Sequence, residues 1–308
     1  MNSTLLIWDE RFLNHKTGLG HPESPERLIA IKEILDQRGK LSLLQPRMAT
    51  DEEISWVHTP ELIDLVKKSR QYDEACFDAD TPTSRGSADA AFLAAGGVIT
   101  ALDQVESGLV SNAFVFPRPP GHHAESNRSM GFCLFNNVAI GAEYLLKKKN
   151  KKRVAIVDID VHHGNGTQHF FEERSDVFYI SSHQYPFYPG TGGAHEKGRG
   201  AGEGFTLNLP LEAGSGDEEL LKGYKKNLLP ALEKYKPDFL IISAGFDAHT
   251  RDPLGGLNIT QKGFQQLTLL LQSLAQKTCD GKIVFVLEGG YDKKGLQEGV
   301  TAVLETIS

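Results

Sequence analysis

The sequence predicts an α/β fold in which a mostly parallel sheet has helices on both faces. Apolar runs typical of strands alternate with helical patterns, as in chains that build such a sheet. The runs are almost continuously apolar, which indicates strands buried on both faces. Strands are expected at Leu5–Trp8, Ala113–Phe116, Val154–Ile159, Val177–Ile180, Phe239–Ile242 and Ile283–Leu287. Helices are expected at Pro25–Gln37, Pro60–Ser69, Ser87–Ser107, Asn136–Lys148, Glu218–Lys234, Gln261–Lys277 and Lys293–Thr306.

Length and composition favour one domain that spans residues 1–308, because no repeat, low-complexity stretch or linker interrupts the chain. The formal net charge of −7 argues against direct binding to nucleic acid. A basic run at 147–153 is expected to be a solvated helix end and loop. No apolar run approaches the ~20 residues of a membrane-spanning helix, and no secretory signal is recognised. Three scattered cysteines, Cys76, Cys133 and Cys279, fit a reducing cytoplasm.

Four of the expected strands lead directly into polar or glycine-rich chain. These segments are residues 117–123, 158–166, 243–247 and 288–291. Ligands of an open parallel sheet bind beyond the carboxyl ends of its strands, so these loops are expected to meet in one crevice. The loops at 10–23 and 182–204 are long for a compact domain and are expected to be functional.

The second of these segments has the spacing of a metal site. In an extended chain, Asp158, Asp160 and His162 point to one face, and Asp247 from another strand end can supply a further ligand. Three protein ligands with an open position are typical of catalytic zinc. Two carboxylates and one imidazole also suit iron(II) or manganese. The alternative is a polar strand end with capping carboxylates.

The neighbouring His122-His123 pair makes that alternative less favourable. The pair fits two imidazoles in a tight loop, each of which needs a partner to orient it. Asp158 and Asn165 are available for that purpose.

Five motifs together resemble the histone deacetylase family, most closely its class II branch and the bacterial histone deacetylase-like amidohydrolases. They are RPPGHHA at 118–124, GFC at 131–133, DIDVHHGNG at 158–166, SAGFDA at 243–248 and EGGY at 288–291. With HPESPER at 21–27, the resemblance covers nearly the whole chain. It implies the arginase/deacetylase fold, with a parallel sheet of about eight strands between helices.

The resemblance also implies a role for individual residues. Zinc would bind Asp160, His162 and Asp247. The catalytic groups would be His122 and His123, oriented by Asp158 and Asn165, and Tyr291, which hydrogen-bonds the substrate carbonyl. Many class I relatives have aspartate where Asn165 stands, so the His123 imidazolium should be less stabilised here and its pKa lower.

Substrate and ion sites follow from the same resemblance. Gly131, Phe132 and Tyr188 would line the acyl-lysine tunnel, although relatives usually have phenylalanine at the position of Tyr188. Leu254 and Asp80 would lie at its rim, and Arg27 in a channel for acetate release. Potassium would bind near the zinc through Asp158, Ser181 and the backbone of Asp160, His162 and Ser182, and at a second site through Phe171, Arg174, Val177 and Phe205.

The expected activity is hydrolysis of acetyl or short acyl groups on lysine by a metal-activated water. The expected partner is an acetylated peptide, protein or amine, not nucleic acid or a membrane. A neutral Leu254 at the rim favours acetyl-lysine, whereas Asp252 and the acidic charge keep acetylpolyamines as an alternative. Another small-molecule amide and an inactive acyl-lysine-binding module are the remaining alternatives.

Overall fold

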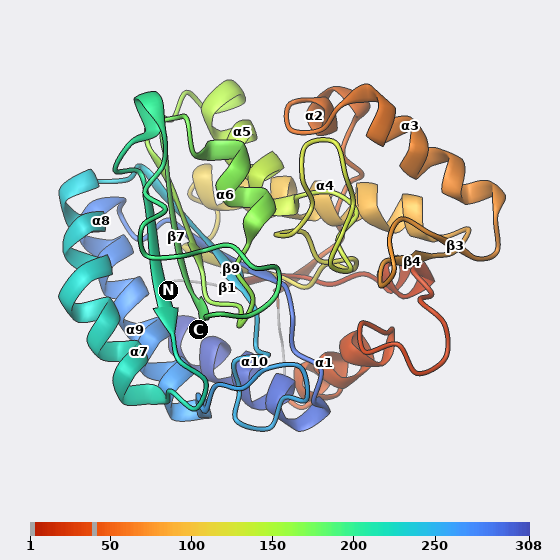
Figure 1. Cartoon of the computed structure of the whole chain (residues 1–308). Coiled ribbons are helices and arrows are strands. Elements are labelled where there is room, and N and C mark those ends of the chain that lie inside the picture. The colour runs from red at the N-terminus through yellow and green to blue at the C-terminus, as the bar shows by residue number, and fades with distance from the viewer. Residues whose placement is uncertain (1–3, 39–41) are drawn as a thin grey trace.

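The computed structural model describes residues 4–38 and 42–308 and centres on one eight-stranded sheet. Figure 1 shows this sheet between its helices. Its strand order is β2-β1-β5-β10-β9-β6-β7-β8, and every neighbouring pair is parallel. A separate antiparallel pair is formed by β3 and β4. The strands are β1 Thr4–Ile7, β2 Ser42–Leu44, β3 Ala75–Cys76, β4 Pro82–Thr83, β5 Asn112–Val115, β6 Val154–Asp158, β7 Val177–Gln184, β8 Thr206–Leu211, β9 Phe239–Ala244 and β10 Ile283–Leu287.

Helices form a layer on each face of the sheet. One layer contains α1 (Glu26–Asp36), α7 (Asp217–Gly223), α8 (Leu229–Tyr235), α9 (Gln261–Thr278) and α10 (Lys293–Ile307). The other contains α2 (Asp51–Ser55), α3 (Pro60–Lys68), α4 (Ser87–Glu106), α5 (Asn137–Lys148) and α6 (Asn165–Phe171). A π-turn, Tyr224–Leu228, joins α7 to α8. Short 3-10 turns lie at Glu10–Asn14 (η1), Ser69–Gln71 and Gly200–Gly202.

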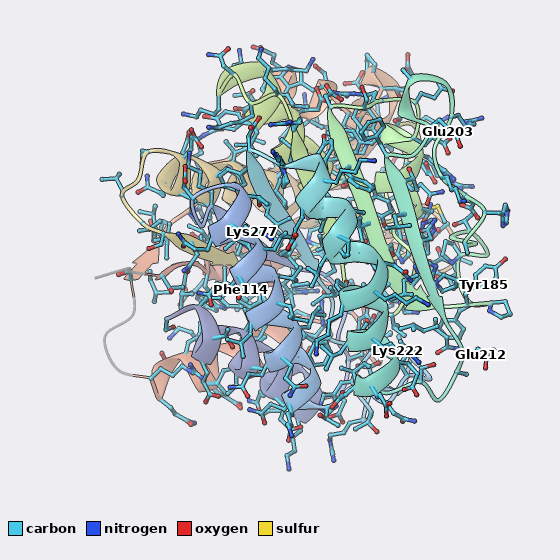
Figure 2. The ribbon with its side chains drawn as sticks, turned by 90° about the vertical axis from the view of Figure 1, so that its left-hand side faces the viewer. Phe114, Tyr185, Glu203, Glu212, Lys222 and Lys277 are labelled. Carbon is cyan, nitrogen blue, oxygen red and sulfur yellow. The ribbon has the colours of Figure 1, made fainter. Side chains whose placement is uncertain are left out.

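Alternation along the central strands explains the two layers. Phe114 of β5 packs into the core beneath α9 and α10, whereas Val115 packs into the core beneath α4 and α5. Successive side chains of a strand point to opposite faces, so each central strand supplies both cores. Figure 2 views the α7–α9 side, with Phe114 behind these helices and Lys222 and Lys277 labelled on them. The predicted α/β fold with eight parallel strands is confirmed.

The elements that the sequence did not predict are the two edge strands of the sheet and several short elements. Strand β2 has three residues, all at least partly exposed, and only half of the residues of β8 are buried. Helix α6 is only seven residues long. The helix expected at 218–234 is present, but a π-turn interrupts it. Weak patterning at edges and in short elements explains these misses, because periodicity needs several repeats to be visible.

Helix α4 is the described segment that comes nearest to a membrane-spanning helix. Among the described residues, this helix alone is long and apolar enough, by length and composition, to cross a membrane. However, 78% of its most apolar window is buried inside the protein, where it packs against α5 and β5. It is therefore a core helix of the domain.

The basic run at 147–153 ends α5 and leads to β6, as predicted. Its side chains pair with acidic residues on nearby elements, for example Lys149 with Asp103 at 2.7 Å and Lys151 with Glu106 at 2.5 Å. Lysines of this run are therefore engaged in ion pairs at the protein surface.

The four strands that lead into the motif loops are neighbours in the sheet. They follow one another in the order β5-β10-β9-β6. Because all are parallel, their carboxyl ends lie at one edge, and the four loops share it. Figure 2 shows this direction on the adjacent strands: Tyr185 and Glu212 lie just beyond β7 and β8, and Glu203 lies before β8 at the other end.

Candidate metal and catalytic site

Three predicted ligands converge at the carboxyl edge of the sheet. One donor atom from each of Asp160, His162 and Asp247 can be chosen so that all lie within 4.8 Å of one another. Nδ1 of His162 lies 3.2 Å from Oδ1 of Asp160 and 3.2 Å from Oδ2 of Asp247. Both carboxylates are fully buried. The backbone N–H of Gly289 donates to Asp160 at 2.8 Å, and that of Val161 donates to Asp247 at 2.9 Å.

Glycines make room for the two carboxylates. A Cβ on Gly289 would lie 2.1 Å from an Asp247 oxygen, and a Cβ on Gly245 would lie 2.0 Å from an Asp160 oxygen. Burial and the neighbouring Asp160 raise the pKa of Asp247 to about 7. Burial lowers the pKa of His162, but its hydrogen bonds to Asp160 and Asp247 outweigh this and raise it to about 10. Two buried carboxylates that need a positive charge between them fit a divalent cation.

Asp158 does not join these ligands, contrary to the alternation expected over 158–162. Strand β6 ends at Asp158, and the chain then turns so that the Asp160 N–H donates to Asp158 Oδ1 at 3.2 Å. The other Asp158 oxygen lies 3.0 Å from Nδ1 of His122 and accepts from the Tyr179 hydroxyl. The extended-chain argument fails beyond the end of the strand, and Asp158 faces the histidine pair instead.

The two histidines lie side by side but have different partners. Their ring centroids are 4.0 Å apart. Nδ1 of His122 faces the Asp158 carboxylate, whereas Nδ1 of His123 lies 2.7 Å from Oδ1 of Asn165. Burial lowers the pKa of His122, but Asp158 and Asp160 outweigh it and hold the pKa well above its usual value. Burial, with His122 and His162 nearby, holds the pKa of His123 well below its usual value.

Tyr291 lies beside the buried Arg27. The guanidinium carbon of Arg27 is 5.0 Å from the centre of the Tyr291 ring. Arg27 donates to the carbonyl of Gly290 at 2.7 Å and to the Glu23 carboxylate at 3.0 Å. Burial raises the pKa of Tyr291 well above its usual value, so its hydroxyl keeps its proton and can donate a hydrogen bond.

Aromatic rings surround the ligands and the histidines. Phe132 packs edge-on against Tyr291 with ring centroids 5.8 Å apart, and Tyr188 packs edge-on against His123 with ring centroids 5.1 Å apart. Gly131 approaches the His123 ring so closely that a Cβ there would lie 2.6 Å from it. Phe187, which was not predicted as a site residue, stacks on His162 with ring centroids 5.4 Å apart. The predicted tunnel residues thus border the predicted catalytic groups.

The predicted rim residues are held by neighbouring loops. Asp80 is exposed, and its carbonyl lies 3.2 Å from Nε2 of His21. Leu254 is half-buried, and its N–H donates to Asp252 at 3.0 Å. The other Asp252 oxygen accepts from the N–H groups of Tyr291 and Asp292. Asp252 therefore ties the Leu254 loop to the Tyr291 loop.

The residues expected at the first potassium site also lie together. Asp158 and Ser181 are register partners in the β6–β7 pair, and the Ser182 hydroxyl donates to the Asp158 carbonyl at 3.5 Å. At the second site, the Arg174 N–H donates to the carbonyl of Phe171 at 2.9 Å, and the Tyr179 N–H donates to that of Phe205 at 3.0 Å. Val177 begins the intervening strand β7.

Several buried charges near the site had no role assigned from sequence. Glu288 accepts from the N–H groups of Gly121 and His122, and burial raises its pKa to about 7. Glu23 accepts from the fully buried Arg118 through both of its oxygens. The signal available in the sequence was their place inside the quoted motifs, EGGY for Glu288 and HPESPER for Glu23.

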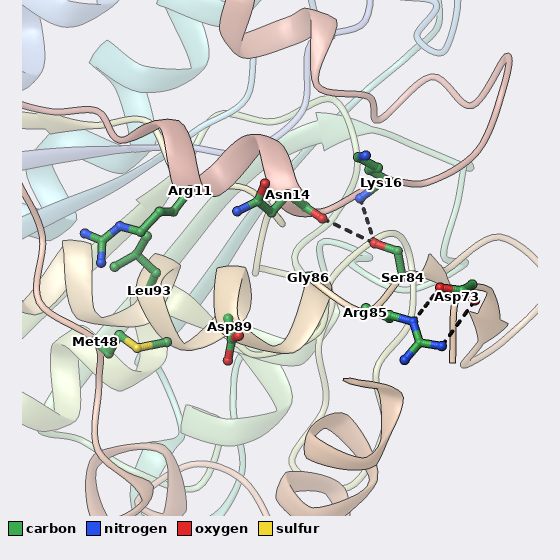
Figure 3. Close-up of a pocket in the computed structure, with 10 residues that line it drawn as sticks. All are labelled: Arg11, Asn14, Lys16, Met48, Asp73, Ser84, Arg85, Gly86, Asp89 and Leu93. Carbon is green, nitrogen blue, oxygen red and sulfur yellow. Dashed lines mark hydrogen bonds and ion pairs between the residues drawn. The ribbon is translucent and has the colours of Figure 1, made fainter. Parts of the chain in front are cut away.

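A pocket of about 570 Å³ lies between η1 and the start of α4 and contains none of the predicted site residues (Figure 3). Its charged walls are largely paired, as Arg85 is with Asp73 at 2.5 Å. The Ser84 hydroxyl accepts from the Lys16 N–H at 3.0 Å and donates to the Asn14 carbonyl at 3.3 Å. This pocket is therefore separate from the predicted metal and catalytic residues.

Comparison with known proteins places this geometry in a family. A profile of the histone deacetylase domain matches residues 21–307. Histone deacetylase 15 of Arabidopsis thaliana is 41% identical over 99% of this chain and 57% of its own length. A probable deacetylase of Archaeoglobus fulgidus is 41% identical over 95% of this chain and 82% of its own length. A histone deacetylase-like amidohydrolase of Pseudomonas aeruginosa is 38% identical over 94% of this chain and 77% of its own length.

Solved structures give the same result. The crystal structure of the HDA15 HD domain matches with a TM-score of 0.95 at 40% identity, over 99% of this chain and 88% of that chain. The present chain spans just over half the length of the first plant relative and most of the length of the two microbial ones. The chain belongs to the histone deacetylase family and carries that family's hydrolytic deacetylase domain.

Proposed function

We propose that the protein is a zinc-dependent amidohydrolase that removes acetyl or short acyl groups from lysine side chains of peptides or proteins. One observation carries the proposal: the buried Asp160 and Asp247 carboxylates and the partly buried His162 lie beside two histidines with unlike partners. An inactive acyl-lysine-binding module would have no need of that arrangement. We propose residues 1–308 as a single catalytic domain.

The donor set fits zinc, with iron(II) or manganese as alternatives. Two carboxylates and one imidazole leave a coordination position open, as catalytic sites require. A divalent ion bound there would polarise the substrate carbonyl and lower the pKa of a water molecule bound to it. Potassium is proposed at two sites. The first lies where Ser181 and Ser182 of β7 adjoin Asp158. The second lies at the backbone near Phe171, Arg174, Val177 and Phe205.

The chain's own groups then have separate tasks. His123 hydrogen-bonds Asn165 through Nδ1, which leaves Nε2 to take a proton from the attacking water and return it to the departing amine. His122 is fixed by Asp158 and stabilises negative charge beside it. The Tyr291 hydroxyl donates a hydrogen bond to the carbonyl oxygen as negative charge develops there. Arg27 is proposed to attract the acetate product.

Acetyl-lysine is the favoured substrate because of the rim. Phe132 and Tyr188 offer apolar rings to an acyl-lysine chain. Leu254 adds no charge, and all three hydrogen bonds that Asp252 accepts come from backbone N–H groups. Asp252 is therefore engaged within the protein, which weakens the support it lent to a cationic polyamine.

An acetylpolyamine is the second candidate, and one observation favours it. Asp78 and Asp80 lie on the loop that holds Phe132, since the Phe132 N–H donates to Thr81 at 3.1 Å. The Asp80 N–H donates to Oδ1 of Asp78 at 3.2 Å, so the two acidic residues lie close together. Partial burial and the neighbouring Asp78 raise the pKa of Asp80. Negative charge near a site raises the local concentration of cationic substrates.

Rates on matched amides separate the two candidates. We expect the zinc-loaded protein to have a higher kcat/KM for an acetyl-lysine peptide than for N-acetylputrescine or acetylspermidine. Leu254→Glu should shift the ratio towards the polyamines, and Asp80→Asn should shift it away from them. A preference for acetylpolyamines in the unmodified protein would overturn the substrate assignment. Absence of hydrolysis of every amide would overturn the proposed function.

The proposed partners and compartment follow from the same features. The partner is an acetylated peptide, protein or amine. The cytoplasm is the proposed compartment, which accords with three cysteines that are free thiols in the structure.

A further inference from the structure

A line of side chains runs from His123 towards the protein surface. Nδ1 of His123 lies 2.7 Å from Oδ1 of Asn165, and Nδ2 of Asn165 donates to Oε1 of Glu125. The same Glu125 oxygen lies 2.8 Å from Nδ1 of His169. The Glu125 side chain is 15% exposed and that of His169 is 40% exposed. Glu125 thus places a carboxylate one residue behind the amide that contacts His123.

An amide at position 165 poses a problem that a carboxylate would not. Its two ends differ, since the oxygen accepts a hydrogen bond and the nitrogen donates one. With the oxygen towards His123, the imidazole carries its proton on Nδ1 and leaves Nε2 free. With the amide turned by 180°, the nitrogen would donate to Nδ1, and the proton of the neutral imidazole would move to Nε2. That tautomer cannot accept a proton at Nε2.

The surroundings of the Asn165 nitrogen determine which orientation is stable. Its possible acceptors are Oε1 of Glu125, the His123 carbonyl at 3.4 Å and the Met130 sulfur at 3.6 Å. Only Glu125 carries a charge, and hydrogen bonds to charged groups are the stronger ones. A turned amide would bring its oxygen against that carboxylate, which is repulsive.

We propose that Glu125 is a positioning residue that fixes the Asn165 amide and thereby the tautomer of His123. The inference rests on the proposed function, in which His123 accepts a proton at Nε2. Asn165 and His169 are four residues apart on α6, so both face Glu125 from one side of the helix. The Glu125 backbone is held as well, because its N–H donates to the Arg128 carbonyl at 2.9 Å and its carbonyl lies 3.0 Å from Nδ1 of His58.

A double-mutant cycle tests the proposal. Glu125→Ala should lower kcat/KM for an acetyl-lysine peptide by about 10-fold, a usual effect of losing an orienting partner. In an Asn165→Asp background the same change should cost much less, because a carboxylate has two equivalent oxygens and removal of Glu125 also relieves repulsion. An equal loss in both backgrounds would reveal a purely structural role and overturn the proposal, as would no loss in either.

Two further variants control for folding. Glu172 is a matched carboxylate at the end of α6, since its side chain is 14% exposed and pairs with Arg199. Glu172→Ala should leave kcat/KM within about twofold, because distant surface changes have small effects. Glu125→Gln can still accept from Asn165 and should retain more activity than Glu125→Ala. If the alanine variant fails to fold, the glutamine variant completes the same cycle.

A spectroscopic measurement decides the inference without activity. In the zinc-loaded protein, the ¹⁵N signals of His123, assigned with His123→Gln, should report a proton on Nδ1. Glu125→Ala should add the Nε2–H form, and Asn165→Asp should restore the first pattern. An unchanged tautomer in Glu125→Ala would overturn the inference. If the wild type hydrolyses no acyl-lysine, the proposed function fails. The ¹⁵N measurement of the His123 tautomer still tests whether Glu125 positions Asn165.

Discussion

His122 and His123 are adjacent in sequence and equally buried, but one imidazole faces a carboxylate and the other an amide. Asp158 holds the pKa of His122 well above its usual value, whereas His123, beside Asn165, has a pKa well below it. A divalent ion at the ligands would lower both pKa values, but the partners would still differ. Two histidines with unlike partners are therefore suited to unlike tasks, one charged and fixed, the other able to exchange a proton.

Removing each histidine tests the comparison most strongly. His123→Ala should lower kcat by about 10²–10⁴, the usual contribution of a general acid–base. His122→Ala should cost less, about 10–100-fold, because it removes a neighbouring charge and an orienting contact. Single-turnover rates of the two zinc-loaded variants make the measurement. Equal losses would mean that the roles are shared, and a larger loss at His122 would reverse them.

Tyr291→Phe provides a reference that involves neither histidine. Loss of one donor to the developing charge should lower kcat by about 10²–10³, while the zinc content stays at one per chain. The reason is that the ring packs against Phe132 and Arg27 with or without its hydroxyl. Metal analysis beside the rate assay checks both parts. Near-wild-type turnover would remove Tyr291 from the mechanism.

Asn165→Asp gives His123 a carboxylate partner like that of His122. A carboxylate beside His123 stabilises its charged form and should raise its pKa by about 1 unit or more. A base with a higher pKa stays protonated to a higher pH, so the acidic limb of kcat/KM should move to higher pH. On that limb the variant should be about 10-fold slower than wild type at equal pH. A limb that stays in place would show that the partner does not set the pKa.

His58 separates the effect of burial from that of a partner, because in the described part of the chain its ring contacts backbone groups and no carboxylate. Burial lowers its pKa to about 4, and its Nε2 accepts from the Asn136 N–H at 2.8 Å. Between pH 6.5 and 4 the unfolded chain binds the proton more readily than the folded one, so stability must fall as pH falls. From pH 6.5 to 5.5 the loss should be about 1 kcal/mol.

His58→Gln should lack this part of the pH dependence. Urea unfolding of wild type and variant at both pH values isolates it from the other buried histidines. If the two proteins lose the same stability on acidification, the site does not stay neutral in the folded state.

The most reliable predictions from sequence were those for residues that directly follow a buried strand. Asp160, His162 and Asp247 stand within a few residues of β6 and β9, and the parallel sheet brings those ends together. The alternation expected over 158–162 did not hold, because it stops where strand β6 stops, but Asp158 faces His122, as the family resemblance implied. Edge strand β2 was missed because only three residues pair.

Contacts between distant loops were not predictable in the same way. Glu125 belongs to the segment after His122-His123, but its contact with Asn165 depends on how α6 packs beside that segment. Phe187 stacks on His162 only because the long loop after β7 folds back over the site. Such contacts have no periodic signature, since they depend on tertiary packing of irregular chain.

Metal removal and restoration test the central claim most directly. Acetate release from an acetyl-lysine peptide should vanish after exhaustive chelation and return in proportion to added zinc, up to one ion per chain. Asp247→Ala should show neither the binding nor the recovery. Undiminished acetate release by metal-free protein would contradict metal-dependent deacetylation at Asp160, His162 and Asp247.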